Sequence, residues 1–312
     1  MRRSATRPLR LAVVVAIPFL IAAPRVVRAT PLTAQGIISG YNLVTGSTVA
    51  SSFDVEGSAI VGGNLTGSNQ FFNNSGRAPA SPTLSVYGDI SGTTKTLAPA
   101  TVYYSTASGT LSLNAGGTAI QNAYPNSLSA YLAPLNAMST QLSGMAQQSG
   151  NTVGVNSGTV TFNGASGTNG IAYIDVTAAQ LATLLPNNTV LFTLGGGVST
   201  IVVNVSGNFS DPGSEHVNSA QTDVLFNFYN AQSITFNSWE TSVLAPGAAT
   251  TTQNAFEGFL YTNTLQAGGE MHNLVYTGYT PPPPPPVPEP ASLSLMAAGL
   301  FGIAATRRRA KA

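Results

Sequence analysis

Val61-Gly62-Gly63-Asn64-Leu65-Thr66-Gly67 recurs 25 residues later as Val86-Tyr87-Gly88-Asp89-Ile90-Ser91-Gly92, and a fainter copy runs from Leu260 to Leu265. In both full copies a glycine precedes Asn or Asp, an aliphatic residue and a small hydroxyl residue. This order suits the corner of a stacked coil, where Gly or Asn adopts a left-handed conformation and the aliphatic side chain returns to the core. Repeats near this period predict a solenoid. A glycine-rich β-sandwich is the alternative that two copies leave open.

The chain around the repeat is rich in short β-type runs. Stretches of Val, Ile, Leu, Phe and Thr, such as Thr159 to Phe162 and Thr200 to Val205, alternate with Gly, Asn and Ser. These runs predict strands with at least one buried face. Only 7% of residues are charged and Gly, Ser, Thr and Asn supply the polarity, which is typical of a turn-rich β protein rather than a disordered chain. We therefore predict a mainly β fold, a β-solenoid resembling a parallel β-helix.

Two segments have helical periodicity. One long helix is predicted near 126–149, flanking the coil, with Pro134 inside it as an expected kink or break. Its apolar face consists of Tyr131, Leu132, Leu135, Met138, Leu142 and Met145. A short helix is predicted from Ala178 to Leu185, because Thr177 and Gln180 form a capping-box pattern. Both apolar faces are interpreted as packing surfaces.

The N-terminus has the pattern of a secretory signal peptide. An apolar stretch from Leu11 to Ala23 follows four arginines, and cleavage is expected after Ala29. The four arginines are Arg2, Arg3, Arg7 and Arg10. Residues 1–29 are therefore assigned to a signal helix, and residues 30–280 to one β domain.

The C-terminus has the pattern of a sorting tail. A polyproline spacer, 281–286, precedes Val287-Pro288-Glu289-Pro290, a 16-residue uncharged run from Ala291 to Thr306, and Arg307-Arg308-Arg309. As a helix the run would rise about 24 Å, slightly less than the hydrocarbon core, with the arginines on the cytoplasmic side. We predict an apolar helix within segment 287–312.

This tail resembles the PEP-CTERM signal of Gram-negative bacteria that secrete exopolysaccharide. The resemblance implies recognition of Pro288-Glu289-Pro290 by a membrane-embedded exosortase. It also implies transient anchoring in the inner membrane, followed by display on the cell surface or release into the extracellular matrix.

The central domain is acidic, although the net charge of the whole chain is close to zero. The net charge is +1, but between Thr30 and Pro286 the cations are Arg77 and Lys95 against ten acids, a net charge of −8. Such a domain has no electrostatic footprint for nucleic acid. The chain has no cysteine, which excludes disulfides and thiolate metal sites.

Blocks of the central domain resemble the choice-of-anchor A domain over roughly residues 33–279. The opening blocks are Ser52-Phe53-Asp54-Val55-Glu56-Gly57 and Ala59-Ile60-Val61-Gly62-Gly63-Asn64. The closing blocks are Leu225-Phe226-Asn227-Phe228, Val243-Leu244-Ala245-Pro246-Gly247-Ala248, Glu257-Gly258-Phe259-Leu260 and Gly268-Gly269-Glu270-Met271-His272-Asn273. The family is similar to collagen-binding adhesin domains and, more distantly, to ice-binding-type β-solenoids with a helix along the coil.

Residues for catalysis or metal binding are sparse, and no catalytic residue or cofactor is assigned. Only His216 and His272 are present, without the spacing of a zinc site. A site combining them with Glu215 and Glu270 is a minor alternative to a structural Glu270–His272 pair. Asp54 and Glu56 share a face if extended, which suits a backbone-bonding turn, an oxygen-ligand Ca²⁺ site or a glycosidase pair.

The leading functional hypothesis is a non-enzymatic surface or matrix protein that binds exopolysaccharide through flat Thr/Ser/Asn-rich faces. Possible stacking residues are Tyr41, Tyr87, Tyr103, Tyr104 and Trp239. The alternatives are an adhesin for collagen or another protein, a carbohydrate-active solenoid enzyme, and an ice-binding surface. No Thr-x-Thr array recurs at the coil period to support ice binding.

Overall fold

The computed structural model describes residues 32–72, 83–114, 116–186, 188–211, 213, 216–217, 221–279 and 281. The predicted signal peptide 1–29 and sorting segment 287–312, with their two predicted helices, lie outside these ranges, as does most of the spacer 281–286. Within them, no helix has both the length and the apolarity that a membrane span requires.

The first half of the domain is a run of short strands after one helix. Helix α1 (Ala34–Gly40) begins at Thr33, whose Oγ1 accepts a hydrogen bond from the Gly36 amide. The strands that follow are β1 Leu43–Thr45, β2 Val49–Ala50, β3 Phe53–Val55, β4 Ala59–Val61, β5 Ser68–Phe71, β6 Leu84–Asp89, β7 Thr93–Thr96, β8 Ala100–Thr106, β9 Thr110–Leu113 and β10 Gly117–Gln121. Helix α2 (Leu128–Ser143) then leads to the second half.

The second half adds more coils and returns to the first. Its helices are α3 (Ala178–Leu184) and the 3-10 helix η1 (Gln221–Asp223). Its strands are β11 Thr152–Asn156, β12 Thr159–Gly164, β13 Ile171–Thr177, β14 Thr189–Leu194, β15 Thr200–Ser206, β16 Phe209–Ser210, β17 His216–Val217, β18 Val224–Asn227, β19 Ser233–Phe236, β20 Ser242–Thr252, β21 Phe256–Glu257, β22 Leu260–Ala267 and β23 Met271–His272.

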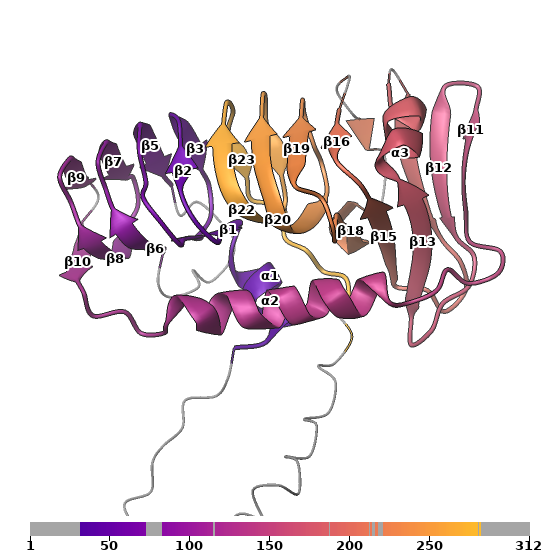
Figure 1. Cartoon of the computed structure of the whole chain (residues 1–312), viewed down its shortest axis with the longest axis horizontal. Helices are drawn as coiled ribbons and strands as arrows, with labels where there is room; N and C mark the ends of the chain where they lie inside the picture. The colour runs from indigo at the N-terminus through magenta and orange to yellow at the C-terminus, as the bar shows by residue number, and fades with distance from the viewer. Residues whose placement is uncertain are drawn as a thin grey trace, which may run out of the picture. The chain divides into compact units, whose positions relative to one another are not determined.

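The coil order differs from the chain order. The largest sheet runs β10-β8-β6-β4-β1-β22-β20-β18-β15-β13, and every pair along it is parallel. The chain thus starts in the middle, adds coils to one end, and crosses along α2 to the other end. It then coils back until β22 pairs with β1. Figure 1 shows β10 at one end, β11 and β12 at the other, and α2 alongside the coils. The predicted mainly β, parallel solenoid with a flanking helix is confirmed.

Each coil has three sides. The path of strands from β10 to β13 in the largest sheet forms the first side, and the remaining strands of that sheet lie on the second. The second consists of β2, β16, β19 and the latter parts of β20 and β22. The third consists of a six-stranded sheet, β21-β23-β3-β5-β7-β9, and a four-stranded sheet, β11-β12-β14-β17. All pairs are parallel except the β11–β12 hairpin.

The repeat that predicted the solenoid lies on neighbouring coils. Val61 pairs with Val86, and Leu65 forms a bridge with Ile90, so the offset of 25 residues is one coil at this point. Among the repeat glycines only Gly67 has a positive φ, of 84°. Gly62, Gly88 and Gly92 are required for another reason, because a Cβ there would collide with the backbone of the preceding coil.

The first side is buried on both faces because α1 and α2 cover it. In β1 and β15, alternate residues point into the coil and toward the helices, so Val44 and Val202 are as buried as Leu43 and Val203. This explains the continuous apolar runs in strands such as β15. The helical face of Tyr131, Leu135, Met138 and Leu142 is buried against them, as predicted.

An asparagine ladder fixes α2 to the sheet. Asn227 Nδ2 donates to the Ser139 carbonyl and to Asn204 Oδ1, both at 3.0 Å, and Ser139 Oγ donates to Asn227 Oδ1 at 2.6 Å. Asn204 Nδ2 donates to the Leu142 carbonyl and to Asp175 Oδ1. Because Ser139, Asn204 and Asn227 are buried, each needs its partner, and the ladder sets the position of the helix along the strands.

The long helix ends at Ser143, so the predicted end near 149 was wrong. It continues through Pro134 as one element, so the first turn is not split off, and a kink at Pro134 stays a prediction. It ends early because Gln147 and Gln148 turn away to the edge of β13, where their Oε1 atoms accept from the Asp175 and Tyr173 amides at 2.8 Å. The short helix and its Thr177–Gln180 capping box are confirmed.

Candidate binding face

Outward side chains on the second side of the coil form a row. Strand pairing places Ser210 beside Thr235 and Thr235 beside Thr251. It also places Thr251 beside Gln266 and Gln266 beside Ala50, and the bridges of Val49, Leu65 and Ile90 continue the row. We call this surface the hydroxyl face, and its row consists of Ser210, Thr235, Thr251, Gln266, Ala50, Thr66 and Ser91.

The core beneath determines which side chains point outward. In β19, Ile234 and Phe236 are fully buried, and Thr235 between them is partly exposed. A second row, two positions earlier along the strands, consists of Ser233, Ala249, Thr264, Thr48 and Asn64. Parallel strands lie about 4.8 Å apart and residues i and i+2 about 6.6 Å apart, so the first row extends about 29 Å.

The two rows favour binding rather than chemistry. The first row contains no ionisable side chain, whereas the second continues from Asn64 to the carboxylate of Asp89 on the next coil. Most members of both rows end in a hydroxyl or amide group that both donates and accepts. An evenly spaced row of such groups suits a ligand that is itself extended and rich in hydroxyl groups. The sequence did not reveal the row, because its members follow the order 210, 235, 251, 266, 50, 66, 91 with unequal intervals.

The predicted charged residues lie on the third side. His272 Nε2 and Glu270 Oε2 are 3.1 Å apart, and His272 Nδ1 lies 3.5 Å from Glu257 Oε1. Burial lowers the pKa of His272, but hydrogen bonds to Glu270 and Glu257 and the charge of Glu56 outweigh it, so the pKa lies above 6.5. The structural Glu270–His272 pair is confirmed.

Asp54 and Glu56 have structural contacts. Glu56 Oε2 accepts from the Asn273 amide at 2.9 Å, which ties the last coil to the first. Burial and the charge of Glu270 raise the pKa of Asp54. Within the described residues, no group of three or more His, Cys, Asp or Glu side chains could hold a metal. Ca²⁺ binding at Asp54 and Glu56 stays a prediction.

The two histidines belong to different sheets. His216 is in β17, beside β14, and His272 is in β23, beside β21 and β3. The coil of His216 contacts the coil of Trp239 and Glu240, because the Val217 amide donates to Glu240. Trp239 in turn forms a bridge with Phe256, whose coil is followed by that of His272. Two coils therefore lie between the two histidines. The joint metal site considered from the sequence is therefore not supported by this arrangement.

The predicted stacking aromatics lie elsewhere. Tyr41 and Trp239 are buried in the core, which excludes them as platforms for a ligand. Tyr87 stacks on Tyr124 with ring centroids 4.2 Å apart and donates from its hydroxyl to the Asn126 carbonyl. Tyr103 lies beside the same pair. These rings pack the start of α2 against the first side, and none belongs to the hydroxyl face.

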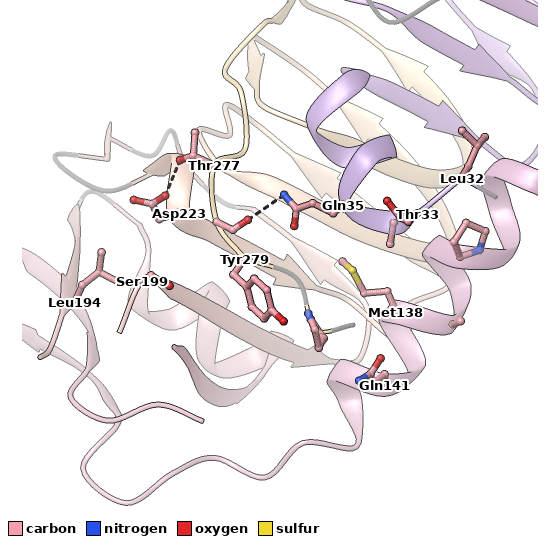
Figure 2. Close-up of a pocket in the computed structure, with 15 residues that line it drawn as sticks. Leu32, Thr33, Gln35, Met138, Gln141, Leu194, Ser199, Asp223, Thr277 and Tyr279 are labelled. Atoms are coloured by element: carbon pink, nitrogen blue, oxygen red, sulfur yellow. Dashed lines mark hydrogen bonds between the residues drawn. The ribbon is translucent and has the colours of Figure 1, made fainter. Parts of the chain in front are cut away.

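A cavity of about 700 Å³ lies between α1, α2 and the C-terminal segment. Figure 2 shows Tyr279 in the middle of it, with Met138 and Gln141 on α2 to one side. Gln35 Nε2 donates to the Gly278 carbonyl, and Thr277 Oγ1 donates to Asp223 Oδ1 at 2.6 Å. Asp223 is the one carboxylate among its described lining residues, so the cavity lacks a pair of catalytic acids.

The parallel coils and the covering helix define the class as a β-solenoid. The family model described as "Putative Ice-binding-like adhesive domain" matches residues 34–273, and the chain belongs to this family. A second model, the PEP-CTERM protein-sorting motif, matches residues 286–309. No curated protein matches the chain. The sorting-tail resemblance is thereby confirmed, whereas the choice-of-anchor A name stays a prediction.

These matches place the protein outside the cytoplasm. An adhesive-type domain followed by a sorting motif is the organisation of a secreted surface protein. The motif implies processing by an exosortase and a sorting step at the membrane. The residues predicted to carry it, Val287-Pro288-Glu289-Pro290 and Arg307-Arg308-Arg309, fall within the matched range.

Proposed function

We propose that the protein is a non-enzymatic adhesin that binds extracellular polysaccharide of its own producer through the hydroxyl face. The observation that carries this proposal is the in-register row over seven successive coils, in which six of the seven side chains end in a hydroxyl or amide group. A polysaccharide is extended, uncharged in many forms, and carries hydroxyl groups along its length. Many weak hydrogen bonds formed along one polysaccharide chain give an overall affinity higher than that of any single contact.

Electrostatics support a neutral or weakly charged polymer. The acids Glu257, Glu270 and Asp54 gather on the third side, away from the hydroxyl face. A polyanion would be repelled from the third side and gain no cation on the hydroxyl face. The polymer is therefore expected to bind with little dependence on salt.

The test is co-sedimentation of the purified full chain with the producer's exopolysaccharide, with cellulose and collagen as comparison ligands and with or without Ca²⁺. Thr251→Lys places a long charged side chain in the middle of the row and is expected to weaken binding about tenfold or more, equivalent to about 1.4 kcal/mol. The matched control is Thr161→Lys, since Thr161 is an outward, partly exposed threonine in β12 on the third side.

Saturable binding that Thr251→Lys removes and Thr161→Lys retains supports the proposal. Equal loss in both variants, or binding to collagen alone, contradicts it. Binding that requires Ca²⁺ and is lost in Glu56→Gln would instead assign recognition to the Asp54–Glu56 side. Polymer cleavage lost in the same variant would show an enzyme.

A further inference from the structure

A small hollow lies at the corner between the first and second sides of the coil. It has a volume of about 260 Å³ and is lined by the last residue of α2, by α3 and by three successive coils. The coils contribute the ends of β13 and β15 and the turn after β18, with Asp175, Ser206 and Tyr229 among their side chains. We call this site the corner hollow.

The corner hollow adjoins the hydroxyl face. Ser206 ends β15 on the first side, and Ser210, the first member of the row, lies four residues further along the chain in β16. Four residues span at most about 14 Å. Hydrogen bonds between coils fix this turn, because the Gly207 amide donates to Asn230 Oδ1 at 2.8 Å and Asn208 Oδ1 accepts from two amides of the next coil. A polymer on the hydroxyl face therefore passes close to the hollow.

Three polar groups in the corner hollow have no partner within the described residues. The Asp175 carboxylate accepts one hydrogen bond, from Asn204 Nδ2 to Oδ1 at 3.1 Å, so its Oδ2 is available. The hydroxyl groups of Ser206 and Tyr229 form no hydrogen bond with the described part of the chain. The hollow thus presents one group that only accepts and two that both donate and accept.

The Asp175 carboxylate is preorganised for a ligand. Asn204, which donates to it, belongs to the buried asparagine ladder and cannot turn away. The carboxyl group is therefore restricted before binding, and less conformational freedom is lost when a ligand binds. The carboxylate at the opposite end of the hydroxyl face differs, since Asp89 already accepts from Thr106 Oγ1 and from the amide and hydroxyl of Ser108.

These groups match the two surfaces of a sugar ring. Hydroxyl groups at the edge of the ring donate to a carboxylate in short, strong hydrogen bonds. The C–H groups on its face pack against an aromatic ring, and the Tyr229 side chain is 37% exposed at the hollow. Asp175 is the one charged residue among the lining residues, which disfavours an anion. A multivalent cation is disfavoured too, since no three His, Cys, Asp or Glu side chains of the described residues could share it.

We propose that the corner hollow binds one neutral hexose unit at the end of a chain or branch of the polymer. This inference rests on the proposed function, because it gives the polymer on the hydroxyl face a second point of attachment. Asp175 accepts from two adjacent hydroxyl groups of the hexose, and Tyr229 covers its C–H face. The ends of α2 and α3 bound the hollow, so it receives a terminal unit. A primary amine held by Asp175 is the competing occupant.

The test is saturation-transfer NMR of the full chain with the methyl glycosides of glucose, galactose and mannose, in a detergent without sugar headgroups. At least one glycoside is expected to bind with a Kd of about 1 mM. Asp175→Asn keeps the bond from Asn204 but removes the charge, and Tyr229→Ala removes the ring. Each is expected to weaken binding about tenfold or more. The matched controls are Asp89→Asn, whose carboxylate is already hydrogen-bonded, and Tyr279→Ala, whose ring is 43% exposed outside the hollow.

The outcomes separate this inference from the proposed function. Thr251→Lys, on the hydroxyl face, is expected to lose polymer co-sedimentation but to keep hexose binding. No hexose signal, or a signal that Asp175→Asn and Tyr229→Ala leave unchanged, overturns the inference even if the polymer binds. Hexose binding without polymer co-sedimentation supports the sugar site and refutes the role of the hydroxyl face. Binding of ethylammonium in place of the hexoses, weakened by salt, overturns the inference and assigns the hollow to an amine.

Discussion

Gly57 must be glycine because of close packing and not because of a positive φ. It lies at the corner between β3 and β4, beside the fully buried Asn42. Asn42 Nδ2 donates to the carbonyls of Gly258 and His272, both at 3.0 Å, so its amide cannot turn away. A Cβ at Gly57 would collide with Asn42 Oδ1. The first and last coils therefore meet through a contact that only glycine permits.

Gly57→Ala is accordingly expected to reduce the free energy of unfolding by about 1–3 kcal/mol, the usual cost of overpacking. The control is Gly154→Ala, because a Cβ at Gly154 would meet no atom within 4 Å. Urea unfolding of both variants measures the difference. Equal stability of the two variants would mean that the backbone around Gly57 accommodates the added methyl group at no cost in the free energy of unfolding.

His272 makes the same junction sensitive to pH. Its folded pKa is raised above 6.5, so the folded state binds the proton more strongly than the unfolded state does. The stabilising contribution is complete below about pH 6.5 and is lost as the pH rises through the raised pKa. The Tm of the wild type relative to His272→Gln is therefore expected to be higher at about pH 6 than at about pH 8. A difference that is independent of pH would show that the pair with Glu270 and Glu257 contributes no net charge interaction.

At the scale of elements, the attachment of α2 depends on polar groups as well as apolar packing. Asn227→Leu keeps the volume but leaves Ser139 Oγ and Asn204 Oδ1 without their partner. Each unsatisfied buried group costs about 1–3 kcal/mol, so we expect a loss of about 2 kcal/mol or more. Hydrogen exchange is expected to accelerate first in α2.

A double-variant cycle separates this effect from general damage. Adding Ser139→Ala to Asn227→Leu removes one orphaned hydroxyl and is expected to cost less than Ser139→Ala does alone. Thr140→Ala, on the exposed face of the same helix, is the control. Strict additivity of the Ser139 and Asn227 variants would argue against the ladder.

The elements also show what the sequence could and could not predict. The capping box of Thr177 and Gln180 is local, so α3 was predicted nearly to the residue. The repeat at Val61 and Val86 revealed stacked coils because it joins neighbours within one half. The end of α2 was mispredicted, since Gln147 and Gln148 are good helix formers that serve a distant strand edge.

The hydroxyl face could not be predicted from the sequence, for a different reason. Partners in a coil stack are set by strand register, and the intervals vary: Leu43 and Ala59 pair at 16 residues, whereas Val61 and Val86 pair at 25. The row also crosses the junction between the two halves, where Gln266 pairs with Ala50. No periodicity in the chain connects such positions. Two of the predicted stacking aromatics, Tyr41 and Trp239, were wrong for a related reason, because composition does not separate a surface aromatic residue from a buried one.

At the scale of the whole molecule, the C-terminal segment after β23 belongs to the folded domain although the family match ends at residue 273. Tyr276 is 1% exposed, and its hydroxyl donates to the Tyr279 carbonyl. The Thr277 amide donates to the Thr222 carbonyl, and the Tyr279 amide donates to Thr200 Oγ1 at 2.6 Å. These bonds fasten the segment to the second half before the spacer begins.

Two truncations therefore separate folding from sorting. A chain ending at Pro286 keeps the fastened segment and loses the sorting motif, so we expect an unchanged free energy of unfolding but a changed cellular location. A chain ending at Asn273 also loses the buried Tyr276 side chain and is expected to be less stable by about 3–5 kcal/mol, the range for removing a large buried aromatic. Chemical unfolding and fractionation of cells measure the two effects. Unfolding of the chain that ends at Pro286 would show that the tail is part of the fold, and unchanged location would remove its role in sorting.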